Sequence, residues 1–234
     1  MEMRITLLGH GKTGKTVEKV ASQKGDTIVH IVTSQNSTSG IGFQEKWIEN
    51  TDVLIDFSVA GAVLDNVRNA VQVKCPIVVG TTGWDSQLDE VRDLVEKGSG
   101  ACVVSSNFSV GVQSLFYLAR QASRLLARLN EFHPFIVESH HCQKVDAPSG
   151  TALSLQQILQ EHYSSDIPVS SVRAGFFPGT HVVGFDSPVD TLTLEHTARS
   201  RQGFAAGAIL AAEWIQGRQG FFDFEEVLFG EEND

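Results

Sequence analysis

The hexapeptide GHGKTG, Gly9 to Gly14, restricts the fold of this 234-residue chain more than any other feature. It follows a short apolar stretch (3–9) and precedes a helical pattern that ends at Gly25, after which a second apolar stretch begins (27–34). A strand, a glycine-rich turn, a helix and a strand in this order are typical of a dinucleotide-binding fold. The backbone N–H groups of such a turn, together with the helix dipole, can bind a pyrophosphate. We therefore predict cofactor contacts from Gly9, Gly11, Lys12, Thr13 and Gly14, and the alternative is a plain glycine-rich turn.

Strands and helices continue to alternate through the first half of the chain. Further apolar strands are predicted at 52–58, 76–84 and 101–109, with helices after the first two. This pattern favours a parallel sheet with helices on both faces. From about residue 110 the pattern changes to α+β. It indicates a long helix, a strand (135–141), a helix (149–163), three strand-like pieces of an antiparallel or mixed sheet, and a last helix (204–217).

Two loops at the predicted strand ends bear on the cofactor. An acid after the second strand would bind the ribose 2′-hydroxyl and repel a 2′-phosphate, but Thr33, Ser34 and two amides stand there. We therefore favour NADPH, with Thr33, Ser34 and Lys12 as phosphate contacts; if this loop makes few specific contacts, NADH serves as well. The turn Gly80-Thr81-Thr82 ends a predicted parallel strand, at the sheet edge where such folds bind ligands. It is either a further cofactor contact or an ordinary turn.

The segment ESHHCQKVDAPSGTA, residues 138–152, gathers most of the titratable chemistry. Successive strand residues point to opposite faces, so His140 and His141 cannot both face one point. This alternation, and the lack of a Cys-x-x-Cys or His-x-x-x-His pattern, count against a metal site, and we predict none. Imidazole exchanges protons near neutral pH, and Lys144 adds a positive charge. One histidine can then act as an acid while the other orients or binds the substrate.

The same segment ends in a predicted helix start. Ser149 is a good N-cap residue, and Gly150 and Thr151 then offer backbone N–H groups and a hydroxyl to an anion. A histidine, a lysine and an anion-binding helix start suit a substrate that carries a carboxylate and must be protonated. The alternative is a purely structural cluster, which would gather many polar groups without a use for them.

This segment closely resembles the substrate-site motif of the 4-hydroxy-tetrahydrodipicolinate (dihydrodipicolinate) reductase family of the diaminopimelate route to lysine. The resemblance extends over nearly the whole chain, through GKTG, DVLIDFS, GTTGW, SSNFSVGV, RAGFFPGTHVVGF and SRQGFAAGA. It implies a Rossmann-like dinucleotide-binding domain of residues 1–110 and 205–234, and a central α+β domain (111–204) for substrate binding and tetramer formation. The implied reaction is hydride transfer from NADPH or NADH to a small cyclic dicarboxylate.

The resemblance also implies roles for particular residues. His140 is the proton donor, and Lys144 assists it while binding substrate. His141 binds substrate, and Gly150 and Thr151 hold a substrate carboxylate. The glycine-rich turn, the Gly-Thr-Thr turn and the SSNF strand end contact the cofactor through Gly11, Lys12, Thr13, Gly14, Gly80, Thr82, Ser106, Asn107 and Phe108.

Composition excludes some other classes. The formal net charge is −10 with no basic stripe, which argues against nucleic-acid binding. No apolar run is long enough to span a bilayer, and no signal peptide is evident, so we expect a cytoplasmic protein without a membrane partner. Its three scattered cysteines fit a reducing compartment. Six acids crowd the last dozen residues, and we interpret them as a solvated tail. Two alternatives remain open, namely an amino-acid dehydrogenase of the aspartate type and a non-catalytic NADP(H) sensor.

Overall fold

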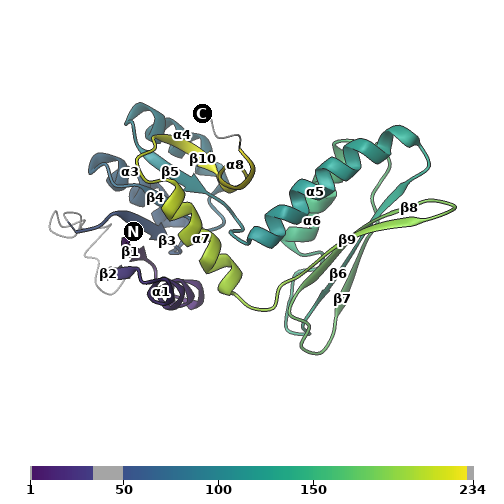
Figure 1. The fold of residues 1–234 in the computed structure, drawn as a ribbon, viewed down its shortest axis with the longest axis horizontal. Coiled ribbons are helices and arrows are strands. Elements are labelled where there is room, and N and C mark those ends of the chain that lie inside the picture. The colour runs from purple at the N-terminus through teal and green to yellow at the C-terminus, as the bar shows by residue number, and fades with distance from the viewer. Residues whose placement is uncertain (1, 34–49, 231–234) are drawn as a thin grey trace. The chain divides into compact units, whose positions relative to one another are not determined.

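The computed structural model describes residues 2–33 and 50–230. The chain divides into two compact units. The first unit comprises residues 1–110 and 201–234, and the second comprises residues 111–200. Figure 1 shows the elements of both units along the chain. This division does not test the predicted roles, which are cofactor binding for the first unit and substrate binding with tetramer formation for the second.

The described part of the first unit contains a six-stranded sheet in the order β10-β5-β4-β3-β1-β2, and every pairing in it is parallel. The strands are β1 (Arg4–Leu8), β2 (Thr27–Val32), β3 (Val53–Asp56), β4 (Ile77–Val79), β5 (Ala101–Val104) and β10 (Gly220–Asp223). The helices are α1 (Lys12–Lys24), α3 (Val63–Gln72), α4 (Leu88–Lys97), α7 (Gln202–Trp214) and α8 (Phe224–Phe229), with short 3-10 turns at Ala60–Ala62 and Asp85–Gln87.

The helices cover both faces of this sheet. One apolar cluster packs α1, α7 and α8 against Ile5, Leu7 and Ile55 of the strands, and the other packs α3 and α4 against Leu8 and Leu54. Neighbouring residues of a strand thus enter opposite cores, as strand geometry requires. The predicted Rossmann-like α/β architecture is confirmed.

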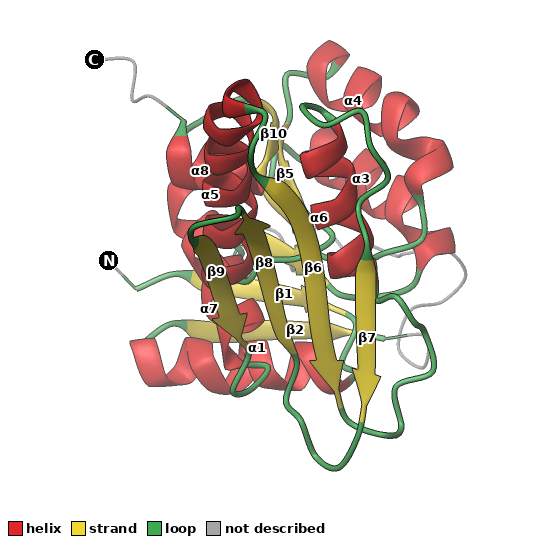
Figure 2. Cartoon of the chain, turned by 90° about the vertical axis from the view of Figure 1, so that its right-hand side faces the viewer, coloured by secondary structure: helices red, strands yellow, loops and turns green. Residues whose placement is uncertain are grey.

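The second unit is an α+β layer. Its sheet has the order β7-β6-β8-β9, and within the described residues β6 pairs with β7 in parallel while β6–β8 and β8–β9 are antiparallel (Figure 2). The strands are β6 (His133–His140), β7 (Val169–Arg173), β8 (Thr180–Asp186) and β9 (Thr191–Thr197). The helices α5 (Val110–Leu126) and α6 (Gly150–Gln160) pack on one sheet face around Ile136, Val183 and Phe185, and a 3-10 turn follows α5 at Ala127–Leu129.

The acids of the predicted solvated tail that the structure describes are at least partly exposed, but they belong to a strand and a helix rather than to a tail. Asp223 ends β10, a sheet strand, and caps α8 by accepting from the N–H of Glu225 at 2.8 Å. The carboxylate of Glu226 accepts in return from the N–H of Asp223 at 2.6 Å. This reciprocal capping box satisfies N–H groups that a helix start leaves free. The remaining acids, Glu231, Glu232 and Asp234, lie outside the described residues.

Candidate functional site

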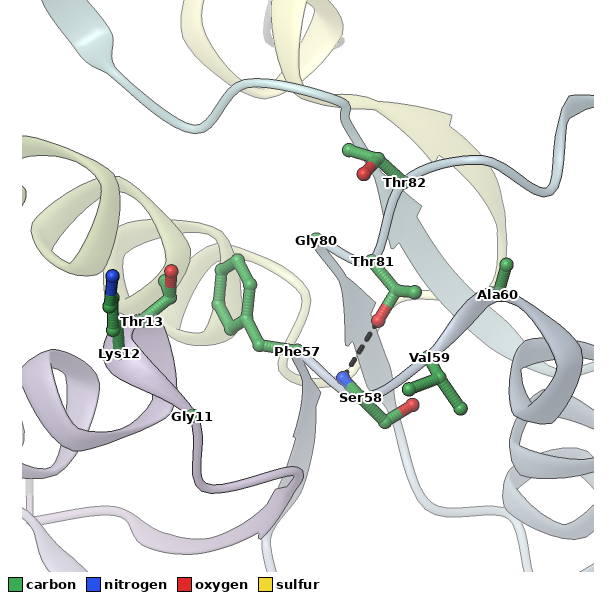
Figure 3. A pocket seen from close by; sticks show the side chains of 10 residues that line it. All are labelled: Gly11, Lys12, Thr13, Phe57, Ser58, Val59, Ala60, Gly80, Thr81 and Thr82. Carbon is green, nitrogen blue, oxygen red and sulfur yellow. Dashed lines mark hydrogen bonds between the residues drawn. The ribbon is translucent and has the colours of Figure 1, made fainter. Parts of the chain in front are cut away.

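A pocket of about 360 Å³ lies at the carboxyl ends of β1, β3 and β4 in the first unit (Figure 3). This edge is where parallel α/β sheets bind ligands. Six predicted cofactor residues line the pocket, namely Gly11, Lys12, Thr13, Gly80, Thr81 and Thr82. Four lining residues that the sequence did not single out come from the connection after β3: Phe57, Ser58, Val59 and Ala60.

The glycine-rich turn is shaped by close backbone contacts. Gly9 has φ +90°, and a Cβ there would lie 2.4 Å from the carbonyl oxygen of Phe57. A Cβ on Gly14 would lie 2.4 Å from the carbonyl oxygen of Gly9. Gly11, in contrast, has no heavy atom of residues 2–33 or 50–230 within 4 Å of a Cβ position. Gly9 and Gly14 therefore hold the turn together, whereas Gly11 leaves room on the pocket side.

The start of α1 is open to an anion. Gly11 is its N-cap residue, and within the described residues no side chain caps the helix there and no acid stands in its first turn. Lys12 is exposed at the same place and lines the pocket with Thr13. Free N–H groups beside a cation are what a phosphate-bearing cofactor requires. The residues present therefore fit the pyrophosphate of a nicotinamide dinucleotide.

A buried carboxylate organises the other side of this pocket. Asp56 is fully buried, and its Oδ1 accepts from Ser58 N–H at 2.8 Å and from the Thr81 hydroxyl at 2.9 Å. Its Oδ2 accepts from the amide of Asn66 at 2.6 Å. Ser58 N–H also lies 2.8 Å from the Thr81 hydroxyl, as Figure 3 shows. The hydroxyl of Thr81 is thus engaged within the protein, while Thr82 is exposed.

Among the described residues, the predicted cofactor contacts Thr33, Ser106, Asn107 and Phe108 do not line this pocket. Thr33 follows β2 and is half-buried, and Ser34 lies outside the described residues. Ser106 is exposed, and the side-chain oxygen of Asn107 accepts from the backbone N–H of Ser109 at 2.9 Å. Phe108 is 1% exposed and packs on Phe224 with ring centroids 4.7 Å apart. Its side chain belongs to the core, so only its backbone remains for a cofactor contact.

The two glycines give a matched test of the turn. Gly14→Ala forces a Cβ against the carbonyl oxygen of Gly9 and must displace the turn, which should cost about 1–2 kcal/mol of cofactor binding, a roughly five- to thirtyfold weaker Kd. Gly11→Ala meets no protein atom, so it should weaken binding only through contact with the cofactor itself. Fluorescence titration with NADPH measures both. If both variants bound NADPH as tightly as the wild type, the turn would not be part of the cofactor site.

The second unit carries a polar cluster on one face of its sheet. Glu138 of β6 is paired in register with Ser171 of β7 and with His181 of β8. His140 lies two residues further along β6, paired with Arg173 of β7. Because side chains alternate along strands, all five point to the same face, the one that carries the apolar core at Ile136 and Val183.

Glu138 is the centre of this cluster. Its side chain is fully buried, and Oε1 accepts from the Arg173 guanidinium at 2.6 Å, the Ser171 hydroxyl at 2.7 Å and the Ser149 N–H at 3.0 Å. Burial favours the neutral acid, but the donors from Ser149, Ser171 and Arg173 outweigh it and lower the pKa of Glu138 to about 2. Glu138 is therefore a carboxylate at neutral pH.

The other oxygen of this carboxylate faces two histidines. Oε2 lies 3.2 Å from Nε2 of His140 and 3.7 Å from Nε2 of His181, whose rings are 5.1 Å apart between centroids. Oε2 and Nε2 of His140 are close but do not meet hydrogen-bond geometry, so the pair is an ion pair only when the His140 ring is protonated. Burial lowers the pKa of His140, Glu138 opposes this, and the charges of Lys144 and Arg173 lower it further.

The remaining predicted substrate residues stand around the end of β6. The strand ends at His140, and His141 is exposed, so the two histidines diverge as their alternation requires. The ammonium group of Lys144 lies 2.7 and 2.8 Å from the two carboxylate oxygens of Asp146, which the sequence reasoning left without a role. Gly150 is exposed and Thr151 half-buried in the first turn of α6.

The start of α6 is preorganised by Ser149. Its hydroxyl accepts from Ala152 N–H at 3.3 Å, as an N-cap should, and lies 3.1 Å from Nε2 of His181. A Cβ on Gly150 would meet no atom within 4 Å. The backbone there is thus accessible to an anion.

The same cluster also contains three potential metal ligands. One ligand atom each of Glu138, His140 and His181 lies within 4.8 Å of the other two, a separation that an ion could bridge. However, Arg173 already binds this carboxylate, and the positive charges of Arg173 and Lys144 that lower the pKa of His140 would also oppose a dication. We interpret the cluster as one that handles protons.

Sequence reasoning missed four members of this cluster: Glu138, Ser171, Arg173 and His181. One signal was present, since Glu138 and His140 stand two residues apart on one strand and must share a face. The others depend on strand register. Ser171 and His181 are 33 and 43 residues from Glu138, and only the pairing of three strands brings them to it.

Comparison with known proteins assigns the family. Residues 3–108 match the family model described as dihydrodipicolinate reductase, N-terminus, and residues 111–228 match the one described as dihydrodipicolinate reductase, C-terminus. The chain belongs to the dihydrodipicolinate reductase family. This confirms the family predicted from the sequence and the prediction of an oxidoreductase.

Individual relatives agree with this family assignment. A 4-hydroxy-tetrahydrodipicolinate reductase from Christiangramia forsetii is 36% identical and covers 97% of this chain and 98% of its own. One from Methanoregula boonei is 38% identical over 76% of this chain and 74% of its own. Both relatives are named for the reductase activity that the motif at residues 138–152 predicts.

Solved structures show the same fold. A dipicolinate-bound dihydrodipicolinate reductase from a Paenisporosarcina species has a TM-score of 0.83 at 23% identity, over 97% of this chain and all of that one. An aspartate dehydrogenase from Thermotoga maritima has a TM-score of 0.54 at 8% identity, over 91% of this chain and 96% of that one. Both likenesses concern fold alone, so the second gives no support to the alternative of an aspartate-type dehydrogenase.

Proposed function

We propose that this chain reduces 4-hydroxy-tetrahydrodipicolinate to tetrahydrodipicolinate in lysine and diaminopimelate biosynthesis, with a nicotinamide cofactor as hydride source. The observation that carries the proposal is the cluster around His140. A histidine beside a buried carboxylate, a lysine and an open helix start lie in one motif of a reductase-family chain. The Paenisporosarcina relative binds dipicolinate, itself a cyclic dicarboxylate, which agrees with this class of substrate.

The first unit holds the cofactor in this proposal. The open start of α1, with Gly11, Lys12 and Thr13, binds the pyrophosphate, and the connection after β3 and the turn at Gly80 and Thr82 border the rest of the pocket. When bound, the cofactor supplies a hydride. The Asp56 network keeps this border rigid, because it ties Ser58, Asn66 and Thr81 to one buried carboxylate.

The second unit binds and protonates the substrate. Loss of the 4-hydroxyl as water introduces a carbon–carbon double bond into the ring. A hydride from the cofactor and a proton from His140 would then add across that bond, so that the products are tetrahydrodipicolinate and water. Lys144 and the N–H groups at Gly150 and Thr151 bind a substrate carboxylate. Since Asp146 already neutralises Lys144, an incoming carboxylate must share or displace that partner. His141, exposed beyond the strand end, binds the substrate from outside the cluster.

A coupled assay tests the proposal. The preceding synthase generates the substrate in situ from pyruvate and aspartate semialdehyde, and absorbance follows the oxidation of NADPH or NADH. Substrate-dependent loss of absorbance is the expected result. A folded chain that binds the cofactor but turns over no substrate would favour the sensor, and activity on aspartate would favour the dehydrogenase.

NADPH is the proposed cofactor, because no acid follows β2 at Thr33. The expected result is a higher kcat/KM with NADPH than with NADH. Thr33→Asp places a negative charge where a 2′-phosphate would lie, and should raise the KM for NADPH roughly tenfold, or about 1.4 kcal/mol, with little change for NADH. Thr33→Asn, which adds no charge, is the matched control. Equal effects of both variants on both cofactors would remove Thr33 from cofactor selection.

The chain acts as a homotetramer in this proposal, through the sheet face of the second unit that α5 and α6 leave uncovered. Four apolar residues on that face are partly exposed, namely Phe135, Val137, Val172 and Val182. A stable assembly would bury such a patch. Light scattering on wild type should give a tetramer, and Val182→Glu should give a smaller species. A wild-type monomer would contradict this.

We also place the protein in the cytoplasm. Its three cysteines are free thiols in the described structure, two of them buried, and burial raises the pKa of Cys75 to about 12. Free thiols suit a reducing compartment. In the described residues no helix is both long and apolar enough to cross a membrane.

A further inference from the structure

The ring of His140 has two unlike edges. Nε2 is buried and lies 3.2 Å from the Glu138 carboxylate. The opposite edge faces Gly179, where a Cβ would lie 3.1 Å from Cε1 and 3.2 Å from Nδ1. A side chain at position 179 would therefore crowd Nδ1, whereas the glycine places no Cβ against that edge of the ring. The side chain as a whole is 12% exposed.

The carboxylate that faces Nε2 is itself fixed. Oε1 of Glu138 accepts from three donors on two elements: Arg173 and Ser171 of β7, and Ser149 at the start of α6. These donors use up one oxygen and prevent rotation of the group. The second oxygen, Oε2, is buried and without an aligned hydrogen-bond partner, and the two imidazoles are its neighbours. A buried carboxylate held in this way orients whatever cation or N–H faces it.

We propose that Glu138 is a positioning residue for the protonation step: it holds the Nε2 side of His140, so that Nδ1 is the nitrogen that gives its proton to the substrate. This inference deepens the proposed function and rests on it only for the identity of the proton acceptor. The imidazolium of His140 loses its Nδ1 proton to the substrate carbon, and the neutral ring keeps its proton on Nε2, next to the carboxylate. A proton from solvent then restores the imidazolium.

Charges from every neighbouring element bear on this step. Glu138 of β6 favours the imidazolium, whereas Arg173 of β7 and Lys144 of the connection to α6 oppose it. His181 of β8 faces the same oxygen, but burial first, and then the charge of His140, lower its pKa to about 4, so it is neutral under assay conditions. Among the described residues whose charge shifts the pKa of His140, Glu138 is the acid that favours the imidazolium. Asp146 pairs with Lys144.

Nuclear magnetic resonance of histidine side chains tests the inference without substrate. Two-bond 1H–15N spectra distinguish the ring tautomers, and the His140→Gln spectrum assigns the signal. The expected neutral form carries its proton on Nε2. Glu138→Gln removes the charge but leaves an amide of the same shape, and should lower the pKa of His140 by at least about half a pH unit. Glu195→Gln, an exposed acid of β9 whose pairing with Val182 puts it on the opposite sheet face, is the control that should change neither.

Kinetics supply the second measurement. Glu138→Gln should lower kcat/KM and move its alkaline decline to lower pH, with the Kd of NADPH unchanged. An Nδ1–H tautomer in wild type, or an unchanged pKa of His140 in Glu138→Gln, would overturn the inference. A wild-type enzyme without reductase activity would instead refute the proposed function and leave the spectra unaffected.

A second pair of variants keeps the test available if Glu138→Gln does not fold. Gly179→Ala and Gly175→Ala both replace a glycine of positive φ, +112° and +48°, but a Cβ approaches His140 only at position 179. Gly179→Ala should therefore lower kcat at least about tenfold more than Gly175→Ala, the equivalent of about 1.4 kcal/mol in the barrier. Equal losses in both variants would exclude Nδ1 as the reacting nitrogen.

Discussion

His140→Gln is expected to lower kcat by about 10²–10⁴-fold, the usual contribution of a general acid, with the Kd of NADPH unchanged. Glutamine keeps a polar side chain at the end of β6 but carries no proton that can be transferred near neutral pH. The substitution also leaves Glu138 with its donors from Arg173, Ser171 and Ser149, so the buried carboxylate stays satisfied. Stopped-flow kinetics with NADPH and the coupled substrate measures the loss, and circular dichroism confirms the fold.

The pH dependence of the wild-type enzyme should agree with this role. Burial lowers the pKa of His140, and Lys144 and Arg173 add to the effect, so the free enzyme carries the proton in a smaller fraction than an unperturbed histidine would. The kcat/KM should therefore fall as the pH rises above that pKa. An anionic substrate beside Lys144 opposes the two cations and favours the protonated ring, so the decline in kcat should lie at higher pH than the decline in kcat/KM.

A matched variant separates this loss from a general effect of the substitution. His162→Gln changes an exposed histidine just after α6 and should retain full activity. If His140→Gln turned over substrate at a rate close to wild type, His140 would not be the donor, and His141 or a water held by Lys144 would take its place.

The sequence predicted the parts of the fold that depend on local patterns. The βαβ start, the helix cap at Ser149 and the divergence of His140 from His141 follow from residue type and from the two-residue period of strands. The strand β10 was not predicted, because its four residues precede a dense group of acids that favours a solvated tail. Two of those acids instead cap α8. The carboxylate of Asp223 accepts from a backbone N–H in the first turn of the helix, and the carboxylate of Glu226 accepts from the backbone N–H of Asp223.

Site residues that are close in the sequence could be predicted from it, whereas site residues that tertiary structure brings together could not. Gly11, Lys12 and Thr13 line the pocket because a helix start follows a strand end. The Asp56 network was not visible, since Asn66 and Thr81 reach that carboxylate from separate elements. The direction of a side chain was not visible either. Phe108 follows a strand at the ligand edge, yet its ring packs into the core on Phe224.

Acidification should destabilise the second unit through His181, by about 3 kcal/mol between pH 6.5 and pH 4. His181 is 5% exposed, and burial is the main reason that its pKa falls from 6.5 to about 4. The charge of His140 adds to the shift, and Glu138 partly offsets it. Within this window the unfolded chain binds a proton that the folded chain does not, so the free energy of unfolding falls as the pH falls.

His181→Asn isolates this contribution, because asparagine keeps a hydrogen-bonding group beside Ser149 but does not titrate. Hydrogen–deuterium exchange of the β6 and β8 peptides, corrected for the intrinsic effect of pH on exchange, reports on the second unit alone. The wild type should lose about 3 kcal/mol more protection than His181→Asn between pH 6.5 and pH 4. His133→Asn, at the exposed start of β6, should behave like wild type. Equal losses in wild type and His181→Asn would mean that His181 is protonated in the folded chain, with Glu138 as its partner rather than that of His140.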